Sequence, residues 1–179
     1  MDFIFGTPIW KLESDSFDEK KITEEIYKAK DLDPEGIVKG KSNFGGYHSG
    51  YDFSAPRTDA YIKRRLEGEG GLDFPHRMNY RWFNINNKGD SNKPHDHGVV
   101  GLSGVLFITD APGLILHSIN KESLLKSLLK LIPSIGNHYL INGKPGEIVI
   151  FPSTIMHWVE PNNSDSARIT YAFNIEVNT

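Results

Sequence analysis

The sequence predicts a mainly β fold with flanking α-helices, in which two sheets form a jelly roll or a closely related barrel. From Met78 onward the chain consists of short runs rich in aromatic and β-branched residues, separated by Gly, Pro, Asn and Asp at close intervals. Eight such runs match the number of strands in a double-sheet jelly roll. The apolar spacing typical of helices precedes Met78, so helices are expected to brace one of the sheets.

The N-terminal segment predicts an extended stretch followed by a helix. Residues 3–12 alternate loosely between apolar and polar side chains and include Pro8, which suits an edge strand or an extended arm. Ser16 or Asp18 is expected to cap a helix that runs through Lys30. This helix carries one apolar stripe, formed by Ile22, Ile26 and Ala29.

A second helix is expected over residues 59–66, and its basic run 63–65 is interpreted as a solvated face. Between the two helices lies the segment 42–49, which contains the paired glycines Gly45 and Gly46. Because glycine adopts backbone conformations that are closed to other residues, we expect a shaped loop here, which could border a site.

The strand-like runs of the barrel are expected near residues 79–86, 94–98, 102–109, 113–118, 138–141, 147–151, 155–159 and 167–176. Helical spacing recurs in the segment 121–132, which predicts an amphipathic insertion with the stripe Leu124, Leu125, Leu128, Leu129 and Ile132. We interpret residues 1–179 as a single domain, with helical support over about 1–77 and the barrel over about 78–179.

Composition excludes several classes of site. The formal charge of −3 gives no basic field that would concentrate polyanions, so no nucleic-acid partner is expected. The chain has no cysteine, which excludes disulfides, thiolate metal sites and a cysteine nucleophile, so that any metal must be held by nitrogen and oxygen. No apolar run approaches the ~20 residues that cross a bilayer, and the N-terminus lacks the basic stretch of a signal peptide. We therefore expect a cytoplasmic protein without a membrane partner.

The histidines of the barrel region are the strongest candidates for chemistry. His95 and His97 are two residues apart, and such residues project from the same face of a β-strand. A third ligand must come from far along the chain, and His157 fits because it follows the strand-like run 147–152 and strand ends converge on the interior of a barrel. Each histidine alone suits an exposed or hydrogen-bonded residue, but together they favour a metal site. The other histidines are expected to be ordinary surface or packed residues: His48, His76, His117 and His138.

Several segments together resemble the 2-oxoglutarate- and Fe(II)-dependent oxygenase superfamily: Trp82-Phe83-Asn84 to Gly89-Asp90, Pro94-His95-Asp96-His97, Leu102-Ser103-Gly104-Val105 and Phe151-Pro152-Ser153-Thr154-Ile155-Met156-His157. More narrowly, the chain resembles a bacterial and phage group of this superfamily in two further segments, Ser42 to Ser49 and Arg168 to Asn174. The resemblance covers most of the chain from Ser42. Its spacing is specific for the superfamily, whereas a single piece such as His-x-His is weak.

The resemblance implies a double-stranded β-helix that holds Fe(II) at one end of the barrel, with 2-oxoglutarate as cosubstrate. It places Arg168, eleven residues beyond His157, as the receptor for the distal carboxylate of the cosubstrate. A planar guanidinium matches a carboxylate bidentately, and the Thr170 hydroxyl shares the same strand face. Asn84 and Ser103 are further candidates for cosubstrate contact, although Asn84 also suits a turn and Ser103 also suits close packing before Gly104.

One departure concerns the metal ligands, because the common iron site of this superfamily has two histidines and one carboxylate. On a regular strand Asp96 points away from its neighbours, so His97 occupies the usual carboxylate position and the site has three histidines. A local bulge would instead turn Asp96 toward the metal. Loss of the carboxylate leaves more positive charge on the metal centre.

The sequence is compatible with three functions. The first is an Fe(II)- and 2-oxoglutarate-dependent dioxygenase that uses O2 to hydroxylate a small molecule or a protein side chain, with release of succinate and CO2. The second is a cupin-like metal enzyme that does not use 2-oxoglutarate, and the third is a noncatalytic jelly-roll binding module. The substrate depends on loops such as 36–58 and 119–137. Trp158 is expected to wall the pocket, and four aromatic residues are expected in the core: Trp82, Phe83, Phe107 and Phe151.

Overall fold

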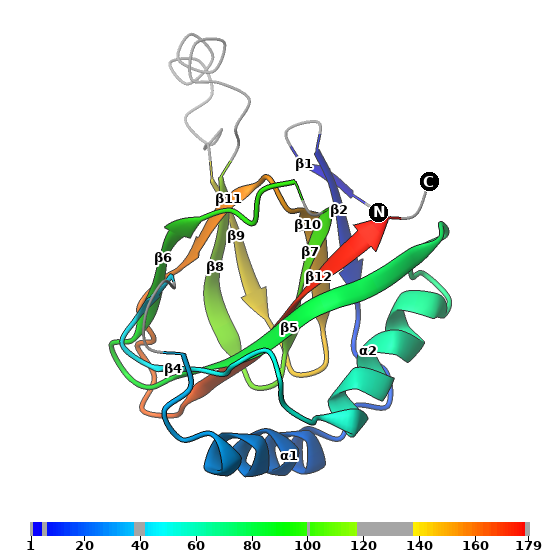
Figure 1. The fold of residues 1–179 in the computed structure, drawn as a ribbon. Coiled ribbons are helices and arrows are strands. Elements are labelled where there is room, and N and C mark those ends of the chain that lie inside the picture. Colours follow the sequence, from blue (N-terminus) through cyan, green and yellow to red (C-terminus); the bar gives the residue numbers. More distant parts are fainter. Residues whose placement is uncertain (1, 5–6, 38–41, 100, 118–137, 178–179) are drawn as a thin grey trace, which may run out of the picture.

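The computed structural model describes residues 2–4, 7–37, 42–99, 101–117 and 138–177, and within them it contains two helices and twelve strands (Figure 1). The helices are α1 (Glu19–Leu32) and α2 (Pro56–Glu67). The strands are β1 (Asp2–Ile4), β2 (Thr7–Leu12), β3 (Asn43–Phe44), β4 (Tyr47–His48), β5 (His76–Asn86), β6 (Ser91–His95), β7 (Leu102–Phe107), β8 (Ala111–His117), β9 (His138–Gly143), β10 (Ile148–Pro152), β11 (Met156–Val159) and β12 (Arg168–Val177). The helix expected over 121–132 lies outside the described residues.

Strands β5 to β12 form a double-stranded β-helix. In the seven-stranded sheet the order is β1-β2-β10-β7-β12-β5-β4, and in the five-stranded sheet it is β3-β6-β11-β8-β9. All the described strand pairs are antiparallel. The eight strands expected from the sequence therefore correspond to β5 to β12, four in each sheet, and the predicted fold class is confirmed.

Two strand predictions differ in part from the structure. The strand expected at 94–98 is β6, which spans Ser91–His95 and ends before Asp96. The sequence of β6 is polar and contains Pro94, so it shows no apolar alternation that would predict its bounds. The edge strand expected within residues 3–12 is β1, at the margin of the seven-stranded sheet, whereas β2 lies inside the sheet because it pairs with both β1 and β10. Pro8 is tolerated since β10 pairs with β2 only at residues 10–12, so the proline removes no hydrogen bond to β10.

A carboxylate caps the N-terminus of each helix. Asp18 caps α1 by accepting a hydrogen bond from the backbone N–H of Lys21 at 3.1 Å. Helix α2 has no side-chain cap of its own, but the Glu25 carboxylate of α1 accepts the backbone N–H groups of Arg57 at 3.0 Å and Thr58 at 2.9 Å. A carboxylate at this position satisfies free N–H groups and is stabilised by the helix dipole.

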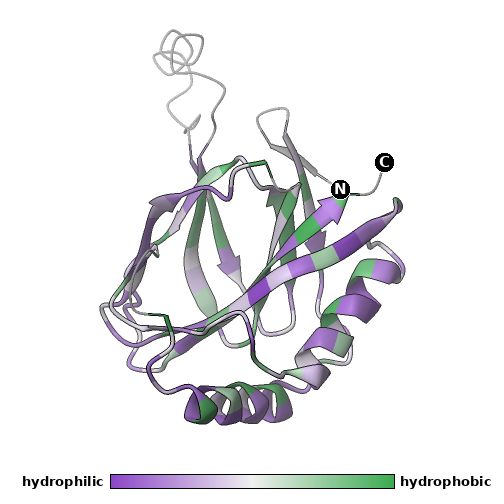
Figure 2. Ribbon diagram, viewed as in Figure 1, coloured by the Kyte–Doolittle hydropathy of each residue, from purple (hydrophilic) through white to green (hydrophobic). Residues whose placement is uncertain are grey.

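Two apolar layers hold the molecule together. Both helices carry hydrophobic and hydrophilic residues, and their apolar sides pack on the seven-stranded sheet (Figure 2). This outer layer includes Ile26, Ile62, Leu66, Phe83, Tyr171 and Phe173. The second layer lies between the sheets and includes Phe107, Leu114, Val149, Phe151 and Ile155. Because side chains alternate along a strand, the residues of β12 that alternate with Tyr171 and Phe173 face the interior of the barrel: Arg168, Thr170, Ala172 and Asn174.

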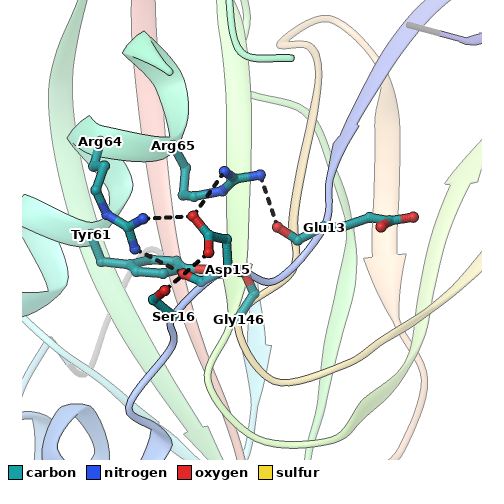
Figure 3. A network of polar contacts seen from close by, with 7 residues as sticks. All are labelled: Glu13, Asp15, Ser16, Tyr61, Arg64, Arg65 and Gly146. Atoms are coloured by element: carbon teal, nitrogen blue, oxygen red, sulfur yellow. Dashed lines mark hydrogen bonds and ion pairs between the residues drawn. The ribbon is translucent and has the colours of Figure 1, made fainter. Parts of the chain in front are cut away.

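The basic run 63–65 of α2 is more than a solvated face. Arg64 Nη1 donates to Asp15 Oδ2 at 2.8 Å, and Arg65 Nη2 donates to the backbone carbonyl of Glu13 at 3.0 Å (Figure 3). Asp15 and Glu13 both belong to the segment between β2 and α1, so the two arginines bond α2 to this segment. Within the described residues, no helix combines the length and apolar character needed to span a bilayer.

Candidate active site

Three histidines meet where β6 pairs with β11. His95 is the last residue of β6, His97 lies in the loop that follows, and His157 lies on β11 directly opposite His95 in the strand register. One ring nitrogen from each lies within 4.8 Å of the others. The antiparallel pairing of β6 and β11 therefore brings together histidines that are far apart in the sequence.

Backbone carbonyls fix the protonation of two of these rings. His95 Nδ1 lies 2.8 Å from the Lys93 carbonyl oxygen, and His157 Nδ1 lies 2.8 Å from the Ile155 carbonyl oxygen. A carbonyl oxygen only accepts hydrogen bonds, so each Nδ1 must carry the proton and donate. Each Nε2 is left with a lone pair, which is the form that binds a metal ion.

Side chains perform the same task for His97. Its Nδ1 lies 2.8 Å from Asn174 Oδ1 and 2.8 Å from Ser103 Oγ. Asn174 lies on β12 and Ser103 on β7, and both side chains are buried. The amide oxygen of Asn174 only accepts, so Nδ1 of this third ring also donates and its Nε2 is free to bind a metal.

Burial keeps all three imidazoles neutral. Burial and the neighbouring His95 lower the pKa of His157 to about 3. Burial is also the main cause that lowers the pKa values of His95 and His97 below the ordinary value for histidine. At neutral pH the three rings therefore offer lone pairs without first losing a proton.

Asp96 does not join this cluster. Its Oδ1 accepts the backbone N–H of Gly98 at 2.9 Å, and the side chain is exposed. The group of ligating side chains that come together in the described residues consists of His95, His97 and His157. Bound to Gly98, the Asp96 carboxylate instead caps the turn that follows His97.

Arg168 is a buried cation with unused hydrogen-bonding capacity. Nη1 donates to the carbonyl oxygens of Glu160 at 2.8 Å and Pro112 at 3.1 Å, and Nη2 donates to that of Asp90 at 3.3 Å. A guanidinium has five N–H groups, so these three bonds leave two, one on Nε and one on Nη2. Within the described residues, Nε is buried without a hydrogen-bond partner. Burial lowers the pKa of Arg168 to about 10, against the opposing effect of Asp90.

The predicted site residues line one cavity between the two sheets. The seven are His95, His97, His157, Arg168, Thr170, Asn84 and Ser103. Asn84 and Thr170 lie opposite each other on β5 and β12, and Asn84 Oδ1 accepts a hydrogen bond from Asn43 Nδ2 at 3.3 Å. The rest of the wall is largely apolar: Val105, Phe107, Leu114, Phe151, Val159 and Ala172. A charged ligand that reaches Arg168 is therefore held among groups that exclude water.

An outer groove of ≈650 Å³ begins on the other side of the histidines. Trp82 packs edge-to-face on His97 at a centroid distance of 5.3 Å, and the ring of His48 stacks on Trp82 at 5.9 Å. Tyr51 follows at 6.1 Å from Trp82, and Tyr80 lies 5.8 Å from Tyr51. Tyr51 is 51% exposed and Tyr80 is 60% exposed. Trp82, Tyr51 and Tyr80 together form an aromatic wall of this groove.

Sequence reasoning missed some of these residues. Asn174 could have been placed, because residues 168, 170, 172 and 174 alternate onto one strand face. Tyr51 precedes α2 in an irregular segment and had no periodic signal. Trp158 does not line the cavity, since it neighbours His157 on β11 and points to the opposite face of the sheet. Trp82, Phe107 and Phe151 line the cavity, whereas Phe83 belongs to the layer beneath the helices.

Other histidines stand apart from the cluster. His117 and His138 lie opposite each other on β8 and β9, with ring centroids 4.9 Å apart, and both pack near Trp158. His76 Nδ1 lies 2.8 Å from the Phe74 carbonyl oxygen at the start of β5. His48 lines the outer groove rather than the cavity.

The fold and the site define a double-stranded β-helix with a cluster of ligating histidines and a buried arginine in one cavity. A family model described as "Putative 2OG-Fe(II) oxygenase" matches residues 80–174. The chain belongs to this family of 2-oxoglutarate-dependent non-haem iron enzymes, whose description names both Fe(II) and 2-oxoglutarate. No curated protein sequence matches the chain.

Solved structures with the same fold are distant in sequence. The carbocyclase SnoK, a non-haem α-ketoglutarate-dependent enzyme of nogalamycin biosynthesis, has a TM-score of 0.67 and 12% identity over 94% of this chain and 79% of SnoK. HygX from Streptomyces hygroscopicus, with nickel, 2-oxoglutarate and hygromycin B bound, has a TM-score of 0.66 and 10% identity over 96% and 84%. A Pseudomonas putida prolyl-4-hydroxylase has a TM-score of 0.60 and 12% identity over 97% and 94%. At such low identity these similarities establish the shared fold.

Proposed function

We propose that this chain hydroxylates a C–H bond of a small molecule, with His95, His97 and His157 as ligands of Fe(II) and Arg168 as the anchor of 2-oxoglutarate. One oxygen atom of O2 enters the substrate as a hydroxyl group, and the other enters succinate as 2-oxoglutarate loses CO2. The observation that carries the proposal is the buried guanidinium of Arg168, whose two unused N–H groups share a cavity with the three imidazoles.

The residues present fit both groups. Imidazole nitrogen is a suitable ligand for iron, and three protein ligands leave coordination positions open. Each of the two free N–H groups of Arg168 can donate to one oxygen of a carboxylate, which is the bidentate arrangement that guanidinium groups form. Thr170 offers a hydroxyl on the same strand face. Iron, when bound, supplies the activation of O2, while this chain orients the reactants and keeps water out.

The substrate is proposed to approach from the outer groove. Its volume of ≈650 Å³ lies within the range of about 300–1,000 Å³ that is common for small-molecule sites. The aromatic wall offers flat apolar faces for a ring of the substrate. Lys93 contributes a positive charge to the groove and Asp96 a negative one. HygX, which shares the fold, was solved with the small molecule hygromycin B bound, so the fold is compatible with a ligand of this size class.

Anaerobic addition of Fe(II) and then 2-oxoglutarate tests the proposed function. The chelate of the two is expected to give a visible charge-transfer absorption, and oxygen is then expected to release succinate. A cupin-like metal enzyme that does not use 2-oxoglutarate would bind the metal without this response. A noncatalytic module would bind no divalent ion, and either result would overturn the proposal.

Candidate substrates can be ranked by how strongly they accelerate succinate release. Tyr51→Ala and Tyr80→Ala are expected to raise KM for an accepted substrate while leaving the affinity for 2-oxoglutarate unchanged. Tyr27→Ala is a matched control, because Tyr27 is a partly exposed tyrosine of α1 that does not line either cavity. An unchanged KM in both groove variants would contradict the assignment of the groove to the substrate.

A further inference from the structure

The three histidines differ in how their Nδ1 atoms are held. His95 and His157 each donate to the backbone carbonyl two residues earlier in the chain, Lys93 and Ile155. Such a bond comes with the local backbone and needs no particular side chain. His97 lies beyond the last residue of β6 and depends instead on side chains from two other strands.

Asn174 and Ser103 form a built acceptor for His97. They lie directly opposite each other in the register of β12 and β7, with exposed fractions of 7% and 1%. The Ser103 hydroxyl donates to Asn174 Oδ1 at 3.3 Å, and each of the two oxygens lies 2.8 Å from His97 Nδ1. The hydroxyl also holds the amide in place, so that its oxygen faces the imidazole.

A histidine at this position needs such support, whereas a carboxylate does not. Non-haem iron oxygenases commonly use two histidines and one carboxylate. A carboxylate has two equivalent oxygens and no tautomers, so either oxygen binds a metal. An imidazole has two distinct nitrogens, and the hydrogen bond made by one of them decides which nitrogen is left to bind the metal.

We propose that Asn174 and Ser103 are a positioning pair that fixes the tautomer and orientation of His97, and that this pair allows a histidine to serve where a carboxylate is usual. The inference rests on one part of the proposed function, that His97 binds the metal. Partners of this kind, when removed, weaken metal binding by about 10-fold to 100-fold. The effect of removing Asn174 is expected to act through His97 alone.

Long-range ¹H–¹⁵N spectra of the histidine side chains test the pair in the metal-free protein. In the wild type, His95, His97 and His157 are expected as single tautomers with the proton on Nδ1. In Asn174→Ala, His97 is expected to populate both tautomers while the other two rings keep theirs, and Asn174→Asp is expected to restore the single tautomer because it keeps an acceptor. Ser103→Ala provides a second variant should Asn174→Ala fail to fold. An unchanged His97 tautomer in both alanine variants would overturn the proposal.

A double-mutant cycle separates positioning from general stabilisation. Asn174→Ala is expected to weaken Co(II) binding by about 10-fold to 100-fold in the wild type, but by less than about twofold in a His97→Asp background. An equal loss in both backgrounds would show that Asn174 acts on the fold, and would overturn the proposal. Asn142→Ala is the matched control, because Asn142 is an exposed asparagine of β9 that bonds Gly113 away from the cluster.

Both measurements are independent of turnover. A failure of the tautomer prediction with intact Fe(II) and 2-oxoglutarate binding would reject the positioning pair alone. Failure of wild-type metal binding would reject the proposed function while the spectra still report on the pair.

Discussion

Replacement of Arg168 by methionine tests the cosubstrate site most sharply. The side chain is 2% exposed, and three of its five N–H groups bond backbone carbonyls of Asp90, Pro112 and Glu160. The remaining two are expected to bind the distal carboxylate of 2-oxoglutarate. Hydrogen bonds to charged groups each contribute about 1.5–3 kcal/mol, so the loss of both predicts about 3 kcal/mol or more. That corresponds to a fall in affinity of roughly 100-fold or greater.

The assay is anaerobic titration of 2-oxoglutarate into the Fe(II)-loaded protein, followed by visible absorption. Arg168→Lys is expected to fall between wild type and Arg168→Met, because an ammonium keeps the charge but does not bind a carboxylate bidentately. Arg77→Met is the control, since Arg77 forms an exposed ion pair with Glu176 at the far end of β5. If Arg168→Met bound 2-oxoglutarate within about threefold of wild type at equal iron content, the assignment would be wrong.

Three further predictions concern the metal and the fold. His157→Ala is expected to abolish stoichiometric Fe(II) binding while His76→Ala retains it, and equal metal content in both would contradict the assigned ligands. In the metal-free protein, the pKa of His157 is about 3 against about 6.5 in the unfolded chain, so between these values the unfolded chain binds more protons and stability falls as pH falls. Urea unfolding is expected to show a loss of roughly 2 kcal/mol between pH 7.5 and 5 from this residue, and His157→Asn should lose correspondingly less. Gly143→Ala would place a Cβ 2.1 Å from the ring of Phe107 and is expected to cost about 1–3 kcal/mol, whereas Gly50→Ala should leave the unfolding temperature unchanged.

The positions of most strands could be predicted because their side chains alternate or form short apolar runs. Strands β5 and β7 to β12 each lie within a few residues of the expected range. The two-residue strands β3 and β4 carry no such signal, since they are too short to show a period. They depend on the turn through Gly45 and Gly46, whose positive φ angles of 71° and 68° bear out the shaped loop expected there.

The histidine cluster was predictable in composition but not in geometry. The spacing of His95 and His97 predicts that both side chains share one face of a strand, yet His97 lies beyond the end of β6. His157 lies opposite His95 because of the register in which β11 pairs with β6. Register between distant strands is set by the packing of the whole sheet, which a single sequence does not display. For the same reason the contact of Asn174 with His97 could not be predicted, although the inward face of Asn174 could.

Some contacts depend on long-range placement alone. Glu25 of α1 caps α2, and Arg64 of α2 bonds Asp15. In the sequence these charged residues look like ordinary surface residues, and nothing there indicates their partners. The prediction that Trp158 walls the pocket was wrong, because it relied on the closeness of Trp158 to His157 in the sequence. Adjacent residues of a strand point to opposite faces, so a neighbour in sequence is the least suitable wall for the same cavity.

Anomalous diffraction from crystals grown with Mn(II) and 2-oxoglutarate tests the central claim most directly. The account predicts one metal peak about 2.0–2.2 Å from Nε2 of His95, His97 and His157, with the distal carboxylate of 2-oxoglutarate on Arg168. A peak bound through Asp96 in place of His97, or a cosubstrate carboxylate that does not touch Arg168, would contradict it.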